Sequence, residues 1–100
     1  MQLRFTPLAR RDLETIGDYI AEDSPSSAVA FVQKLRAQCN NIRRLPQAYR
    51  LRPDIAENIR SSVYGRYVIY FAVESGTVLI VRILHGAMDA AAHIDAQSGN

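Results

Sequence analysis

The apolar residues of this 100-residue chain change their spacing near residue 58. Before that point they recur every three to four residues, which is the period of one face of an α-helix. After it they alternate with polar residues or form short continuous runs, as in β-strands. A chain divided in this way is predicted to fold as α+β, with helices packed on a sheet.

Two amphipathic helices are predicted in the first half. Thr6-Pro7 and Ser24-Pro25 are start signals, because the hydroxyl caps free backbone amides and proline fits the first helical turn. Leu45-Pro46 ends the second helix, since proline disfavours helical geometry in the residue before it. A short link between the helices predicts a helical hairpin. The residues of the two apolar stripes are Leu8, Ala9, Leu13, Ile16, Tyr19 and Ile20, then Ala28, Phe31, Val32, Leu35, Cys39 and Ile42.

The remaining segments are predicted to be strands. Leu3 and Phe5, with polar neighbours, indicate a short opening strand. Runs at 58–63, 67–74 and 77–84 are rich in β-branched and aromatic residues, and short Gly-containing links join them as consecutive antiparallel hairpins. The last two runs are apolar on both sides, so we expect them to be central or covered twice. The predicted order is β-α-α-β-β-β, with the helical hairpin on one face of an antiparallel sheet.

Length and composition predict one domain over residues 1–100, with a core at about 2–89 and a tail at 90–100. The 48% of hydrophobic and 22% of charged residues are ordinary for a soluble protein. The Ala-rich stretch after Gly86 is predicted to form a short helix. Neither a signal peptide nor a run of ~20 apolar residues is present, so we expect a cytoplasmic protein that does not contact the membrane.

Positive charge is concentrated in the middle third of the chain. Residues 34–66 carry eight of the twelve Lys and Arg residues and only two of the ten acids. Such a segment predicts an acidic partner, either protein or nucleic acid. The alternative is an ordinary solvated surface, on which Arg43 and Arg44 complement the C-terminal end of the second helix.

A set of short segments punctuates this order of elements over roughly residues 3–89. The segments are Ala9-Arg10-Arg11-Asp12-Leu13, Ser24-Pro25, Leu45-Pro46, Ile59-Arg60, Tyr67-Val68-Ile69-Tyr70 and Val81-Arg82-Ile83-Leu84-His85-Gly86. In this order and spacing they resemble the RelE/ParE superfamily of bacterial toxins, and the ParE branch most closely. The chain departs from that branch at Ala87-Met88, where relatives commonly carry two basic residues.

The resemblance implies the toxin of a type II toxin–antitoxin system, which inhibits DNA gyrase, blocks replication and arrests growth. It also implies neutralisation by a ParD-like ribbon-helix-helix antitoxin. The toxin would contact operator DNA only indirectly, through this antitoxin. We predict that a disordered C-terminal segment of the antitoxin folds along grooves and sheet edges of the toxin. Its acids would meet the basic middle third, at Arg43, Arg44, Arg50 and Arg52.

Two arginines interrupt apolar strands without a local reason. Successive side chains of a strand point to opposite faces of the sheet. Arg60 is therefore predicted to point to the face opposite to Ile59, and Arg82 to the face opposite to Val81 and Ile83. If the helices cover the face that holds these three apolar residues, both arginines project from the open face. Because an unpaired charge on a covered face is costly, each must be paired locally or be available to a partner.

Arg60, Arg82 and His85 are therefore the predicted target-binding residues. The alternative for the arginines is an ion pair with a nearby carboxylate such as Glu57 or Glu74. For His85 the alternative is a structural hydrogen bond, which is the commoner role of a single histidine.

The main alternative function is a ribosome-dependent mRNA endonuclease of the RelE type. That reaction needs groups that activate the 2′-hydroxyl and protonate the leaving oxygen, with cations that stabilise the charged phosphorane. Arg60, Arg82 and His85 are the nearest candidates, but no tyrosine follows Tyr70, and Lys34 is the single lysine. We therefore predict a binding protein and not an enzyme. A weaker third possibility is an inert relative that only binds the antitoxin.

No cofactor or metal is expected. Cys39 is the single cysteine and lies on the core stripe of the second helix, which predicts a buried, inert thiol. His93 has no partner at a spacing typical of metal ligands. Asp12 and Glu14 are expected to stabilise the first helix through i,i+4 or dipole interactions.

Overall fold

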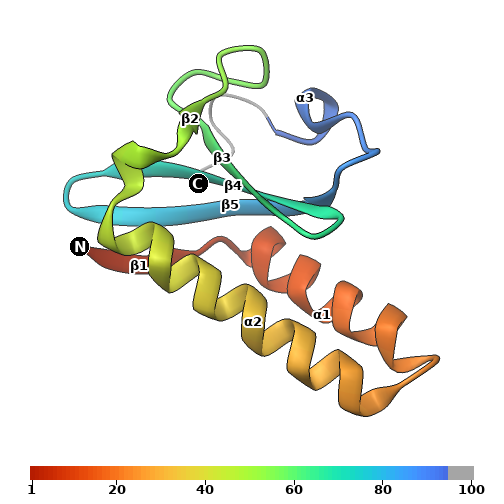
Figure 1. Ribbon diagram of the computed structural model, residues 1–100. Coiled ribbons are helices and arrows are strands. Elements are labelled where there is room, and N and C mark those ends of the chain that lie inside the picture. Colours follow the sequence, from red (N-terminus) through yellow and green to blue (C-terminus); the bar gives the residue numbers. More distant parts are fainter. Residues whose placement is uncertain (95–100) are drawn as a thin grey trace.

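The computed structural model describes residues 1–94, as a helical hairpin packed against one face of a sheet (Figure 1). The predicted helices and strands are present, and a two-residue strand is added before the predicted hairpins. The elements are β1 (Gln2–Phe5), α1 (Pro7–Ala21), α2 (Pro25–Arg44), the 3-10 turn η1 (Pro46–Ala48), β2 (Arg50–Leu51), β3 (Arg60–Tyr64), β4 (Tyr67–Glu74), β5 (Thr77–His85) and α3 (Ala90–His93). The short helix expected in the tail is therefore found at α3, while residues 95–100 of the predicted tail lie outside the described residues.

The sheet has five strands in the order β1-β5-β4-β3-β2. The hairpins β3–β4 and β4–β5 are antiparallel as predicted, but β1 pairs in parallel with β5, so the sheet is mixed. The reason is topological. α2 returns the chain to the end of the sheet where β1 starts, so β3 runs in the direction of β1, and β5 does so again two hairpins later (Figure 1).

Two backbone conformations set the limits of the hairpins. Asn58 has a φ of 63°, a left-handed conformation that a strand does not tolerate, so β3 begins at Arg60 and not at residue 58. Ser75 and Gly76 both have positive φ, at 46° and 76°, as the tight two-residue turn between β4 and β5 requires.

Both predicted helix caps are confirmed. The Thr6 hydroxyl accepts a hydrogen bond from the amide of Ala9 at 3.0 Å and donates one to the carbonyl of Val81 at 2.7 Å. Thr6 therefore starts α1 and fastens that start to β5. Ser24 accepts from the amide of Ser27 at 3.3 Å, but its cap is exposed. In the described range 1–94, no helix combines the length and the apolarity that a membrane crossing needs.

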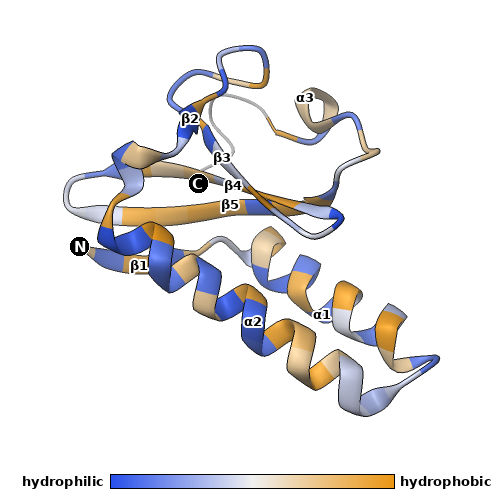
Figure 2. Ribbon diagram, viewed as in Figure 1, coloured by the Kyte–Doolittle hydropathy of each residue, from blue (hydrophilic) through white to orange (hydrophobic). Residues whose placement is uncertain are grey.

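The sheet is covered on both faces, as the apolar character of β4 and β5 predicts. The helix-side core joins the sheet to the hairpin through Ala9, Leu13, Ile16, Leu35, Cys39, Ile42, Ile69, Phe71, Val78, Ile80 and Ile83. The opposite core lies under the loop before β3 and under α3, and contains Ile59, Tyr70, Ala72, Val81, Leu84, Ala90 and Ile94. Figure 2 shows β5 as hydrophobic along much of its length, consistent with its contribution to both cores.

Cys39 is fully buried in the helix-side core, as predicted. Burial raises the pKa of its thiol to about 12, because the thiolate loses its hydration there. At neutral pH the thiol is protonated, which makes it a poor nucleophile.

Candidate functional site

Arg82 is held by Asp12 of α1. The guanidinium Nε and Nη2 atoms donate to the two carboxylate oxygens at 2.8 and 3.0 Å, and the side chains are only 14% and 12% exposed. The pKa of Arg82 is raised, chiefly by these hydrogen bonds to Asp12. The local pairing that we held open for Arg82 is thus found, but its partner is Asp12 rather than Glu57 or Glu74. The expected role of Asp12 within its own helix is corrected accordingly.

Asp12 also binds a backbone group of β5 that has no partner strand. β1 ends at Phe5, which lies opposite Ile80, so the rest of β5 has no neighbour on that edge. The Asp12 carboxylate accepts a hydrogen bond from the amide of Ile83 at 2.9 Å and thereby caps this edge. Because Asp12 and Arg82 are 70 residues apart, no pattern in the sequence indicated their contact.

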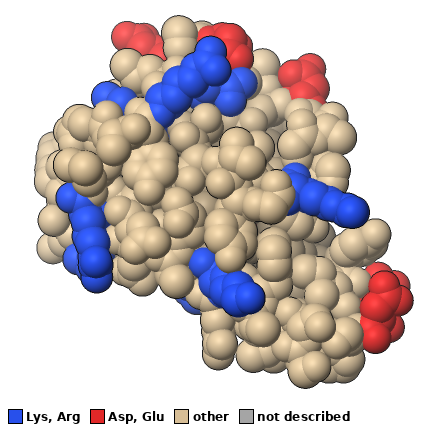
Figure 3. All heavy atoms as spheres, viewed as in Figure 1, with Lys and Arg blue, Asp and Glu red and all other residues tan. Residues whose placement is uncertain are grey.

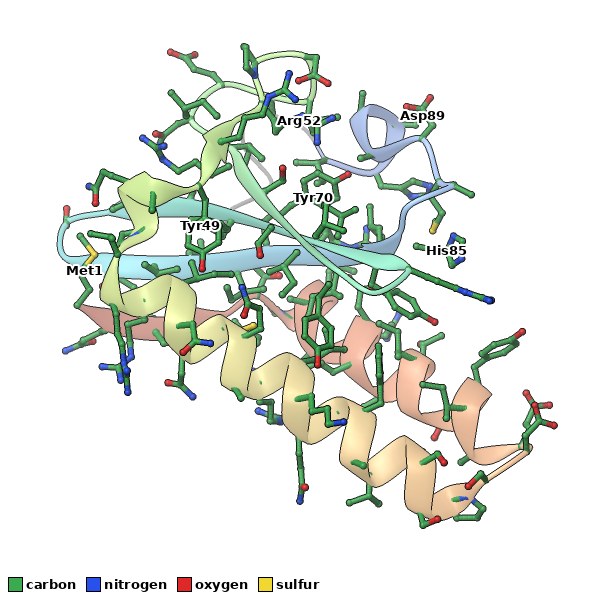
Figure 4. All side chains as sticks on the ribbon, viewed as in Figure 1. Met1, Tyr49, Arg52, Tyr70, His85 and Asp89 are labelled. Carbon is green, nitrogen blue, oxygen red and sulfur yellow. The ribbon has the colours of Figure 1, made fainter. Side chains whose placement is uncertain are left out.

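A β-bulge overturns the predicted alternation in β5. Tyr70 lies opposite Arg82 and Phe71 lies opposite Ile80, so Val81 is an extra residue. As a result Val81 belongs to the core away from the helices while Ile83 belongs to the helix-side core, and the two were wrongly placed on one face. Arg82 starts on the face of Tyr70, which Figure 4 shows on the side away from the helices, and its guanidinium reaches Asp12 on α1.

Arg60 does not project from the open face either. It lies opposite Phe71, a residue of the helix-side core, and its Nη1 donates to the carbonyl of Tyr49 at 2.7 Å. Ile59, its neighbour, faces the opposite core. The helices therefore cover the face opposite to the one that holds Ile59. The prediction that both arginines project from an open face is wrong.

The four basic residues predicted to bind the antitoxin differ in their contacts within the toxin. Arg43 donates to the carbonyl of Met1 at 3.2 Å, and Arg52 forms an ion pair with Asp54 at 2.9 Å. The hydrogen bond from Arg52 lowers the pKa of Asp54. Arg44 and Arg50 are exposed. In the view of Figure 3 some positive side chains lie together with acids at the top of the molecule, near the β2–β3 loop, while the others stand apart, and further acids lie at the α1–α2 link.

A groove of about 740 Å³ runs between α1 and α2. Its apolar lining consists of Leu13, Gly17, Ala21, Ala28, Val29 and Val32. Charged and polar residues at its borders include Arg10, Glu14, Asp18 and Arg36. Val29 is 60% exposed, so part of the apolar lining of the groove is open to solvent. The sequence predicts grooves that bind the antitoxin, but it assigns both helices to core packing and does not locate a groove between them.

A second hollow of about 400 Å³, here called the β5-edge hollow, lies on the other side of α1. Its lining residues are Asp12, Thr15, Ile16, Tyr19, Arg66, Tyr67, Ile83, Leu84, His85 and Met88. The rings of Tyr67 and His85 meet edge to face at 5.6 Å. Tyr19, placed in the core stripe from the sequence, is 69% exposed here.

His85 lies at the end of β5, where Figure 4 shows it apart from the labelled residues Tyr70 and Arg52. Its Nδ1 accepts a hydrogen bond from the amide of Ala87 at 3.1 Å, the structural bond that we considered as its alternative role. His85 is exposed, whereas Arg60 and Arg82 are engaged elsewhere, so the structure does not bring the three candidate residues together. Within residues 1–94, no cluster of three His, Cys, Asp or Glu residues is placed to hold a metal ion.

Comparison with known proteins gives one family. Residues 3–90 match the family described as "ParE toxin of type II toxin-antitoxin system, parDE". A Caulobacter vibrioides protein named "Toxin RelE2" is 34% identical over 86 residues, which cover 86% of this chain and 96% of that protein.

Two solved structures share the fold. A chain of the chromosomal ParDE toxin–antitoxin system from P. aeruginosa has a TM-score of 0.73 and 25% identity, with coverage of 85% of this chain and 95% of that one. A chain of the toxin–antitoxin complex RelBE2 from Mycobacterium tuberculosis has a TM-score of 0.54 and 26% identity, covering 84% and 95%.

Proposed function

Because this chain belongs to the ParE toxin family of type II toxin–antitoxin systems, we propose that it arrests growth by inhibiting DNA gyrase and that a ParD-like antitoxin neutralises it. The observation that carries the proposal is the match to the ParE family over nearly the whole chain. The higher TM-score to the ParDE chain, 0.73 against 0.54 for RelBE2, supports the same branch.

The contacts made by Arg60 and Arg82, the candidate catalytic cations, favour inhibition by binding over RNA cleavage. Phosphoryl transfer at RNA requires cations directed at the phosphate. Arg82 is committed to Asp12, and Arg60 donates to a backbone carbonyl. Only His85 and Arg66 remain at the end of β5, and neither a lysine nor a tyrosine follows in the sequence after residue 85. A protein with this set is better suited to hold a partner than to cleave a phosphodiester.

The antitoxin is proposed to place an amphipathic helix in the groove between α1 and α2. A groove with an apolar lining and charged borders suits one apolar helix face, in the helix-in-groove mode of recognition. Arg10 and Arg36 at its border, with Arg44 beyond them on α2, would attract acids of the antitoxin. Contacts of Arg43, Arg50 and Arg52 with the antitoxin stay a prediction.

The test is a supercoiling assay with purified gyrase, run beside an in-vitro translation assay at the same toxin concentrations. The proposal expects inhibition of supercoiling that addition of the antitoxin reverses, with translation unaffected. Translation that stops while supercoiling continues would contradict it.

The second candidate is a RelE-type mRNA endonuclease, favoured by the name of the Caulobacter vibrioides relative. Primer extension on translated message separates the two. Codon-positioned cuts that depend on His85, tested with His85→Ala, would establish this function instead.

A further inference from the structure

The outer edge of β5 has no partner strand next to α1, although α1 covers it at Ile83, which is 2% exposed. β1 pairs with β5 only from Thr77 to Ile80, so the strand continues to His85 without a neighbour on that side. The Ile83 amide points outward, since it bonds to Asp12. By the alternation of strand hydrogen bonds, the His85 amide points the same way, and His85 is exposed. This amide can donate to the backbone of an extended segment of another chain.

The β5-edge hollow lies beside these backbone groups. Tyr19 and Met88, which are 69% and 42% exposed, stand at the hollow together with Tyr67 and Arg66. Tyrosine, methionine and arginine are enriched in protein interfaces, and tyrosine and arginine also among the residues that contribute most of the binding energy. Two aromatic side chains, a flexible thioether and the exposed end of strand β5 together form a surface suited to a protein segment.

The free charge of the hollow is positive. Asp12 is neutralised by Arg82. Arg66 is exposed, and among residues 1–94 no carboxylate lies within ion-pair distance of it. A segment that enters the hollow would therefore gain from an acidic residue near Arg66.

From this combination we infer that the toxin binds its target protein through the β5-edge hollow. The occupant is an extended target segment with a large apolar side chain next to an acidic residue. Its backbone accepts a hydrogen bond from the His85 amide, its apolar side chain packs among Tyr19, Tyr67 and Met88, and its acid meets Arg66.

The target is a better occupant than the antitoxin because the two hollows lie on opposite sides of α1. The groove toward α2 uses Leu13, Gly17 and Ala21 of α1, whereas the β5-edge hollow uses Asp12, Ile16 and Tyr19. This assignment rests on the proposed toxin function and on antitoxin binding in the α1–α2 groove, but not on gyrase as the target.

Growth arrest and antitoxin binding, measured separately, test the inference. Tyr19→Ala and Arg66→Ala are expressed from a titratable promoter in the full chain, with Arg11→Ala as the control. Arg11 is an exposed arginine of α1 that lines neither hollow. Thermal unfolding and titration with the full-length antitoxin are measured on the same purified proteins.

We expect Tyr19→Ala and Arg66→Ala each to raise the toxin level that halves growth by roughly tenfold or more, the size of an interface hot spot. Arg66→Lys, which keeps the charge, should restore part of the activity. Melting temperature and antitoxin affinity should equal those of Arg11→Ala. Full toxicity of both variants would overturn the inference, and so would a parallel loss of antitoxin binding, which would assign the hollow to the antitoxin.

These outcomes are independent of the identity of the target. If gyrase is not the target, the supercoiling assay fails while Tyr19→Ala and Arg66→Ala still lose growth arrest. If the hollow is wrong, these variants stay toxic whichever target the supercoiling and translation assays identify.

Discussion

Asp12 and Arg82 join α1 to β5 through a bidentate ion pair, and the same Asp12 carboxylate binds the Ile83 amide. The pair therefore covers the sheet edge at Ile83, beyond the end of β1, and its two side chains are largely withdrawn from water. The positive charge of Arg82 therefore has a structural role in the ion pair with Asp12. Target binding is not needed to explain why an arginine stands in this strand. His85, at the end of the same strand, keeps an exposed position beside the β5-edge hollow.

We predict that Arg82→Ala destabilises the fold. Removal of one partner leaves the Asp12 carboxylate without its counter-charge in a mostly covered position, at a cost on the order of 2–3 kcal/mol, below that of a fully buried pair. Urea unfolding measures the change. In the double variant Asp12→Ala/Arg82→Ala the loss should be smaller than the sum of the single losses, because each single change removes the same interaction. Wild-type stability of Arg82→Ala would mean that the charge is kept for a partner after all.

Thr6 and Ser24 offer a matched comparison of two helix caps. Thr6→Ala removes the cap of α1 and also the buried hydrogen bond to Val81, so we expect a loss of about 2 kcal/mol. Ser24→Ala removes the cap of α2 and a hydrogen bond to the Ser27 hydroxyl, both exposed, and should cost about 1 kcal/mol or less. Thermal unfolding of both variants checks the order, and equal losses would show that the bond to Val81 adds nothing.

Cys39 should resist alkylation in the folded protein. A raised pKa, about 12, favours the protonated thiol, so the reactive thiolate is scarce at neutral pH. Iodoacetamide at neutral pH is expected to label Cys39 only as fast as the protein unfolds, with rapid labelling in denaturant as the control. Fast labelling of the native protein would show that α2 opens locally around this residue.

The helices and hairpins were predictable because their signals are local. Thr6-Pro7, Ser24-Pro25 and Ser75-Gly76 act through their own backbone, and the stripes follow one helical period. The parallel pairing of β1 with β5 depends instead on how the chain returns through α2, which no local pattern records.

The candidate site was less predictable, since it depends on contacts between distant residues. The extra residue at Val81 shifts the alternation that was used to place Arg82, and Asp12 is a partner 70 positions away. The position of His85 at the end of the last strand followed from the sequence, because that strand ends at the turn before Gly86. Tyr19 was assigned to the core by its spacing, although α1 extends beyond the sheet at that point (Figure 1) and leaves its ring exposed.

The α1–α2 groove makes a separate prediction about neutralisation. Val29→Glu places a charge on the apolar lining, where an antitoxin helix would have to cover it without a partner, at a cost of several kcal/mol. We expect isothermal titration to show a loss of at least about a hundredfold in affinity for the antitoxin's C-terminal segment, converted at 1.4 kcal/mol per tenfold. The wild-type protein should bind that segment with a negative heat-capacity change, as burial of apolar surface requires.

Ala30→Glu is the matched control, because Ala30 is exposed on the same helix and outside the groove. Both variants carry the same added charge, so a difference between them reports position alone. Val29→Glu should remain toxic and escape neutralisation in cells that express the antitoxin, whereas Ala30→Glu should be neutralised normally. If the antitoxin binds Val29→Glu as tightly as Ala30→Glu, its helix lies elsewhere, and the β5-edge hollow becomes the next place to look for it.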